Sequence, residues 1–152
     1  MSERLLIPQD DEYFQAVGLA AIAFARLEWD AVWCCEKLQS GYIRSIEEKR
    51  KTAGKIAEDL KQLFSQVSDK TLLAKIEPFA EEFREVAKER NALFHAKPGT
   101  SKNREQRLFR EGVEWSISAV NAFSDRCVSA AMPLNALLHN EFADVGSVQL
   151  KS

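Results

Sequence analysis

Three residues that lie within six positions of one another, Arg90, Asn91 and His95, have side chains that phosphodiester chemistry uses. An arginine binds phosphate oxygens through a fixed fork of N–H donors and stabilises negative charge that develops on the phosphate. A histidine exchanges protons near neutral pH, so it can act as a general base or acid. Asn91 and His95 are four residues apart and share one face of a helix. At the C-terminal end of that helix, the dipole favours a protonated His95.

Arg90 also occupies an unexpected place on the helix that we predict from about Phe79 to His95. At about 100° per residue it lies about 20° from Phe79, in the middle of an apolar stripe. The other members of that stripe are Phe83, Val86, Leu93 and Phe94. A guanidinium cannot lose its charge, and its burial without a partner costs several kcal/mol. Arg90 therefore needs either a carboxylate, for which Glu28 is the candidate, or a cleft that anions enter.

Positive charge is concentrated around this segment. Residues 84–110 carry 8 Lys/Arg against 3 Asp/Glu, a net +5, whereas the whole chain has a net charge of -2. The basic residues that follow His95 are Lys97, Lys102, Arg104, Arg107 and Arg110. A basic segment in an acidic protein indicates a local anion site, and these side chains would attract a polyanion. A solvated loop with its share of Lys and Arg explains the charge equally well.

The element expected to lie beside this site is a long first helix over about 11–39, with Asp10 as its N-cap. Apolar residues recur along it at i, i+3, i+4 spacing over about seven turns. Its opposite face is apolar too, with Leu19, Ile22, Trp29 and Trp33. A helix that is apolar on two sides is buried on two sides, and one short chain has few helices to cover both. We therefore expect a homodimer.

The rest of the chain also predicts helices. A second helix is expected over about 46–67, and a short one from Lys70 to Pro78, which either kinks the chain or opens the next helix. After a loop marked by Pro98 and Gly99, in which RLFR could form a short extended piece, the last helix is expected over about 116–142. It begins at Ser116 as N-cap, has a kink at Pro133, and is followed by a frayed tail over 143–152. Nothing demands a sheet, so the predicted fold class is all-α: a single domain, 1–152, forming an antiparallel bundle of four to five helices.

The composition sets further bounds. The chain has 152 residues, 45% hydrophobic and 29% charged, without an apolar run long enough to cross a bilayer. The N-terminus has no secretory signal, so we expect a cytoplasmic protein. Cys34, Cys35 and Cys127 fit neither a disulfide framework nor the spacing of zinc ligands, and we expect them to be buried hydrophobes. No metal and no cofactor is expected.

The segment RNALFH, Arg90 to His95, resembles the R-N-x-x-x-H signature of the HEPN superfamily. Its members are all-α bundles and include many metal-independent endoribonucleases of toxin–antitoxin, abortive-infection and CRISPR-associated systems. The resemblance covers six residues and their helical context. It implies that His95 is the general base or acid at the ribose 2′-hydroxyl, that Arg90 stabilises charge on the phosphate, and that Asn91 orients the site. It also implies a 2′,3′-cyclic phosphate product, a dimer with two motifs facing one cleft, and an antitoxin protein as a partner.

Three functions therefore remain open. The first is a dimeric endoribonuclease, a toxin or antiviral defence effector, whose RNA substrate is contacted by Lys97, Lys102, Arg104 and Arg107. The second is a non-catalytic HEPN-like helical module that binds a nucleotide, RNA or a partner protein through the same cleft. The third is a purely structural bundle in which Arg90 is permanently paired with Glu28.

Overall fold

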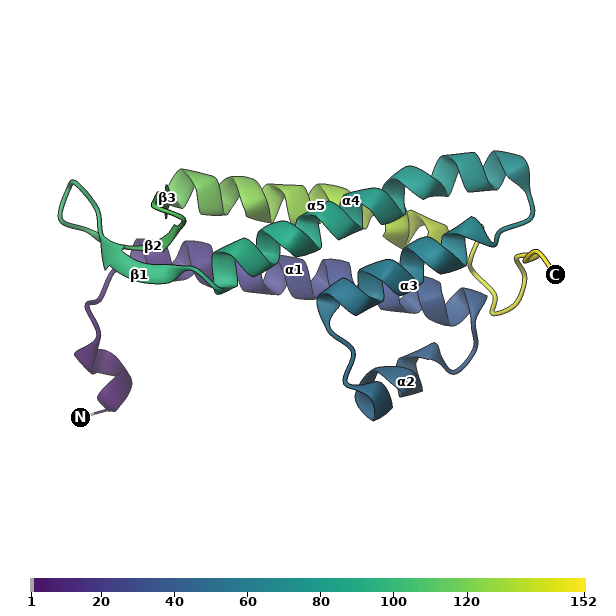
Figure 1. Ribbon diagram of the computed structural model, residues 1–152, viewed down its shortest axis with the longest axis horizontal. Coiled ribbons are helices and arrows are strands. Elements are labelled where there is room, and N and C mark those ends of the chain that lie inside the picture. Colours follow the sequence, from purple (N-terminus) through teal and green to yellow (C-terminus); the bar gives the residue numbers. More distant parts are fainter. Residues whose placement is uncertain (1) are drawn as a thin grey trace.

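The computed structural model describes residues 2–152. In this range the helices are α1 (Asp11–Leu38), α2 (Tyr42–Lys49), α3 (Ala53–Ser65), α4 (Lys70–Phe94) and α5 (Ile117–His139). A short 3₁₀ helix, Glu3–Leu6, precedes α1. Three strands lie between α4 and α5: β1 (Lys97–Thr100), β2 (Gln106–Arg110) and β3 (Val113–Trp115) (Figure 1). The protein is mostly helical, but the sheet corrects the expectation of an all-α fold.

Helices α1 and α5 begin at the N-cap residues that the sequence predicts. The Asp10 carboxylate accepts a hydrogen bond from the Tyr13 backbone N–H at 3.1 Å, and α1 ends at Leu38, one residue before the predicted end. Ser116 caps α5 in the same way, by accepting from the backbone N–H of Ala119. These caps satisfy backbone donors that have no partner within the helix, which fixes where each helix starts.

Two predicted helix boundaries are wrong. The helix expected over 46–67 is split into α2 and α3, because Arg50 takes a left-handed conformation (φ 48°) and Thr52 caps a new helix by accepting from the Lys55 N–H. Conversely, Pro78 does not open a new helix, since α4 runs through it; the alternative, a kink at this residue, stays a prediction. A proline removes only one backbone donor, and the packing of the long helix outweighs that loss.

Four helices form the core. Helix α1 packs along α5, α5 along α4, α4 along α3, and α3 along α1. The interior is filled by large side chains that include Leu27, Phe64, Phe83, Phe123 and Phe142. Helix α3 is short and lies beside only the N-terminal part of α4 (Figure 1). The C-terminal part of α4, which carries Arg90, therefore has no α3 beside it.

The segment 97–115 is a small antiparallel sheet in the order β1-β2-β3 rather than a loop. The piece RLFR is extended, as the sequence suggested, and forms most of β2. β2 turns into β3 through Glu111 and Gly112, both with positive φ (52° and 78°), which is the geometry of a tight hairpin turn. The sheet is tied to α1 through the Tyr13 hydroxyl, which donates to the Trp115 carbonyl at 2.7 Å and accepts from the Leu108 N–H.

The C-terminal segment, expected to be frayed, packs back on the bundle. Leu150 forms an isolated β-bridge with Val67, and the Ser68 N–H donates to the Gln149 carbonyl at 3.0 Å. Val148 and Leu150 are partly buried against the core. The three cysteines are free and buried, which confirms their predicted role as small hydrophobes. Within residues 2–152, no helix combines the length and apolar character needed to cross a membrane.

Candidate functional site

The three residues of the predicted site lie together at the C-terminal end of α4. Arg90 is half-buried, whereas Asn91 is exposed. His95 is the C-cap residue, exposed, and its backbone N–H donates to the Asn91 carbonyl at 3.0 Å. One and a half turns of a single helix thus hold an arginine, an amide and an imidazole, as the spacing predicts.

Two phenyl rings hold Arg90. Its guanidinium carbon Cζ lies 5.4 Å from the centroid of the Phe24 ring on α1 and 5.5 Å from that of the Phe94 ring. Both separations are within the range of a cation–π contact. Phe24 is itself fixed by stacking on Phe83, with 6.3 Å between ring centroids. Aromatic faces from two helices therefore position the guanidinium, so its edge of N–H donors stays available for other partners.

One of those donors is used by Asn91. The Arg90 Nη1 atom donates to the side-chain carbonyl oxygen of Asn91 at 3.0 Å. This contact draws the guanidinium toward Asn91, the next residue along α4. Asn91 thus has a physical means of orienting Arg90; the role that the HEPN resemblance implies for it stays a prediction.

Glu28 does not form the direct ion pair with Arg90 that the structural alternative requires. Within residues 2–152, no carboxylate oxygen lies within 4.0 Å of the Arg90 guanidinium. Glu28 is half-buried, and burial raises the pKa of its carboxyl group, while the positive charge of Arg90 opposes that rise. The carboxylate is close enough to sense the arginine but does not occupy its donors. Arg90 can still bind an anion from outside.

The His95 imidazole is open to solvent. No hydrogen bond joins its ring nitrogens to any other group in the part of the chain that the structure describes. An exposed imidazole can exchange a proton with a bound ligand, and His95 follows Arg90 by five residues, about 140° around the helix. The other histidine, His139, is exposed in the last turn of α5 and has no arginine at the motif spacing.

Three of the four residues predicted to contact RNA lie on the surface of the hairpin that follows His95. Lys97 is in β1, and Lys102 and Arg104 are in the turn that connects β1 to β2; all three are exposed. This β1–β2 hairpin begins two residues after His95. The basic side chains therefore extend the positive surface outward from the end of α4.

Arg107, the fourth residue predicted to contact RNA, is not on that surface. It is only 6% exposed, and its guanidinium contacts Asp10 at 2.9 Å and Glu105 at 2.7 Å. Its Cζ atom also lies 4.5 Å from the centroid of the Tyr13 ring. These contacts join β2 to the start of α1. This placement argues against an RNA contact for Arg107, and we leave it out of the proposed RNA surface.

Sequence reasoning missed the two rings around Arg90. Phe24 lies on the predicted buried stripe of the first helix, and Phe94 on that of α4, so each looks like an ordinary core residue. Their role depends on the packing of α1 against α4, for which the sequence carries no separate signal. Side chains alternate between the two faces of a strand, so the buried position of Arg107 could be anticipated only after a strand had been assigned to this segment.

Within residues 2–152, no group of three or more His, Cys, Asp or Glu side chains gathers where it could hold a metal ion. Comparisons with protein families, with curated proteins and with solved structures found no match for this chain.

Proposed function

We propose that the protein is a metal-independent endoribonuclease of HEPN type that uses Arg90, Asn91 and His95. The observation that carries the proposal is the state of Arg90. This cation is half-buried and lies against two aromatic rings, yet no carboxylate among residues 2–152 forms an ion pair with it. A guanidinium kept in place without an internal anion is suited to an anion that comes and goes, and a phosphodiester is such an anion.

In the proposed reaction the nucleophile belongs to the substrate. His95 takes the proton of the ribose 2′-hydroxyl, and the 2′-oxygen attacks the adjacent phosphorus. Arg90 stabilises the negative charge that accumulates on the phosphate oxygens, and Asn91 keeps the guanidinium oriented toward them. The bond from phosphorus to the 5′-oxygen then breaks, which leaves a 2′,3′-cyclic phosphate and a 5′-hydroxyl that has gained a proton. This route needs a base and a cation but no metal-bound water.

RNA would approach along the β1–β2 hairpin. Lys97, Lys102 and Arg104 are exposed and carry the positive charge that attracts a phosphate backbone. Single-stranded RNA is the expected substrate, because in-line attack needs a flexible backbone. As part of the same proposal, the protein acts in the cytoplasm as a toxin or antiviral defence effector, with an antitoxin protein as a regulatory partner.

A comparison of two arginines on α4 tests the proposal. Single-stranded RNA is incubated with EDTA and with the wild type, Arg90→Ala or Arg84→Ala; Arg84 is a partly exposed arginine on the same helix that contacts Glu81 at 3.7 Å. We expect cleavage by the wild type and by Arg84→Ala, and a loss of about 100-fold or more in Arg90→Ala. Circular dichroism shows whether each variant is folded. If the folded wild type leaves RNA intact, the proposal is wrong.

A second candidate function is binding without cleavage. It is favoured by the freedom of the His95 ring, which no hydrogen bond orients in residues 2–152, whereas general bases in enzymes are commonly held by a neighbour. The same arginine would then bind the phosphate of a nucleotide or RNA and release it unchanged. Filter binding with a labelled oligonucleotide separates binding alone from cleavage. If the protein only binds, Arg90→Ala abolishes binding, and neither the wild type nor any variant cleaves the oligonucleotide.

A further inference from the structure

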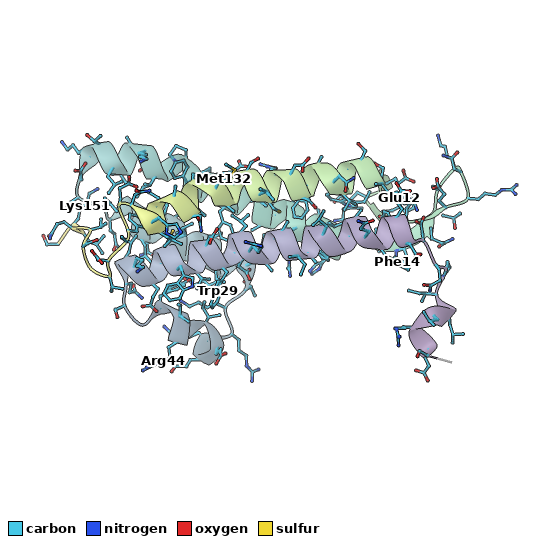
Figure 2. The ribbon with its side chains drawn as sticks, turned by 180° about the vertical axis from the view of Figure 1, so that it is seen from behind. Glu12, Phe14, Trp29, Arg44, Met132 and Lys151 are labelled. Carbon is cyan, nitrogen blue, oxygen red and sulfur yellow. The ribbon has the colours of Figure 1, made fainter. Side chains whose placement is uncertain are left out.

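The outer face of α1 is apolar and exposed. Leu19, Ile22 and Trp29 are 56%, 61% and 50% exposed, although side chains of this size are usually covered in a protein interior. On the neighbouring helix α5, Val128 and Met132 are 54% and 67% exposed. These residues line an open groove of about 1080 Å³ between α1 and α5, the α1–α5 groove, which faces the viewer in Figure 2. A contiguous apolar patch of this kind is typical of surfaces that bind a protein, a ligand or a membrane.

The charges in the groove indicate what covers it. Among its lining residues, Arg26 and Asp30 are the charged ones, and they lie one helical turn apart on α1. Asp30 is partly buried, and burial raises the pKa of its carboxyl group, while the Asn135 side chain and the charges of Arg26 and His139 oppose that rise. When two identical helices cross antiparallel about a two-fold axis, Arg26 of each comes opposite Asp30 of the other. The groove is thus self-complementary in charge as well as apolar.

We propose that the α1–α5 groove is the contact surface between two copies of this chain, related by a two-fold axis near the middle of α1. Arg26 of each copy then pairs with Asp30 of the other. The same register brings Ile22 to the level of Trp33 of the second copy, so that exposed apolar residues on each side cover one another. Trp29 and Met132, which both line the groove, then lie within the contact, where large side chains contribute most to binding.

This interface does not include the Arg90 site. The groove is lined by residues of α1 and α5 alone, whereas Arg90 and His95 belong to α4. Helix α4 lies in front of α1 and α5 in Figure 1 and behind them in Figure 2. On α1, Phe24, which contacts Arg90, is about 140° around the helix from Trp29. Each copy therefore keeps its own site, unlike the single shared cleft that the HEPN resemblance implies.

Sedimentation equilibrium of the full chain tests the interface. Ile22→Lys and Met132→Lys place a charge in the proposed contact, and because both side chains are mostly exposed, folding is little affected. We expect a dimeric wild type and a dissociation constant raised at least about tenfold in each variant. Val113→Lys, at a 70% exposed position in β3, serves as the matched control and leaves the dimer unchanged. A monomeric wild type, or a dimer indifferent to both groove variants, overturns the proposal.

A charge exchange tests the two-fold pairing itself. Arg26→Asp and Asp30→Arg each bring like charges together and weaken the dimer, whereas the double variant restores a pair of opposite charges and the wild-type dissociation constant. If the double variant stays as weak as the single ones, the proposed pairing is wrong. The proposal does not depend on ribonuclease activity, because these measurements read molar mass. A dimer without nuclease activity overturns only the proposed function, and an active monomer overturns only the interface.

Discussion

The guanidinium carbon of Arg90 on α4 lies 5.4 Å from the centroid of the Phe24 ring on α1. The contact joins the end of one helix to the middle of another, at a place that α3 does not cover. An aromatic face attracts a cation without neutralising it. Arg90 can therefore be positioned by the fold and still carry a charge that a phosphate can use, which a permanent pair with a carboxylate would prevent.

The relation between Arg90 and Glu28 leads to a first prediction. Burial raises the pKa of Glu28 above 4.5, so the charged carboxylate opposes folding. Below pH 4.5 the carboxyl group of Glu28 is neutral and its contribution favours the folded state. That contribution is lost as the pH rises through the raised pKa of Glu28 in the folded protein. At neutral pH, Glu28→Gln should therefore raise the free energy of unfolding on the order of 0.5–1 kcal/mol, measured by urea denaturation. A loss of about 3–5 kcal/mol would instead show that Glu28 is the essential partner of Arg90.

The second prediction concerns Asp10. Its pKa is lowered by the hydrogen bond from the Tyr13 backbone N–H and by the one from the Arg107 guanidinium. The charged Asp10 carboxylate stabilises the folded state above pH 3.8. This stabilisation is lost as the pH falls through the lowered pKa of Asp10 in the folded protein. Asp10→Asn keeps an N-cap but removes the charge. We expect the variant to be less stable than the wild type at neutral pH and to lose less stability on acidification, as read from urea midpoints. If acidification lowers the stability of the wild type and of Asp10→Asn by the same amount, the role given to the Arg107 contact is wrong.

The third prediction separates Arg107 from the exposed basic residues of the hairpin. Lys102→Ala and Arg104→Ala should each weaken RNA binding and reduce the slope of log K against log salt by about 0.7, because each removes one phosphate contact. Arg107→Ala should lower the free energy of unfolding by about 2 kcal/mol through the loss of its charged hydrogen bonds and its packing on Tyr13. Arg44→Ala, an exposed position on α2, is the control for a nonspecific loss of positive charge. An unchanged slope in both hairpin variants would exclude this surface.

The sequence predicts the helices best where local signals agree. Helix α1 could be bounded at both ends because a capping carboxylate, acidic residues in the first turn and a long apolar stripe all indicate the same element. The split between α2 and α3 was missed because the polar run 47–52 contains no glycine or proline, and a left-handed Arg50 has no strong sequence signature. The capping residue Thr52 was the available signal.

The sheet was missed because its strands are short and contain the residues that usually mark loops. Gly99 lies within β1, and a side chain there would meet the Phe109 ring, which crosses over from β2. The pair Glu111-Gly112 was a usable hairpin signal, since glycine readily takes positive φ at such turns. For the candidate site, helical spacing placed Arg90 and Asn91 in the last turns of α4 and His95 at its end, and that is where the structure has them. The ring of Phe24 could not be predicted, because it depends on how α1 and α4 pack.

The most direct measurement of the central claim is the end group of the RNA product. A 5′-labelled single-stranded RNA is incubated in EDTA with the wild type, with His95→Ala and with His139→Ala, which removes the only other histidine of the sequence. We predict 2′,3′-cyclic phosphate ends from the wild type and from His139→Ala at equal rates, and a rate at least about 100-fold lower from folded His95→Ala. Cleavage by His95→Ala at the wild-type rate, or products with other ends, would contradict the proposed role of this site.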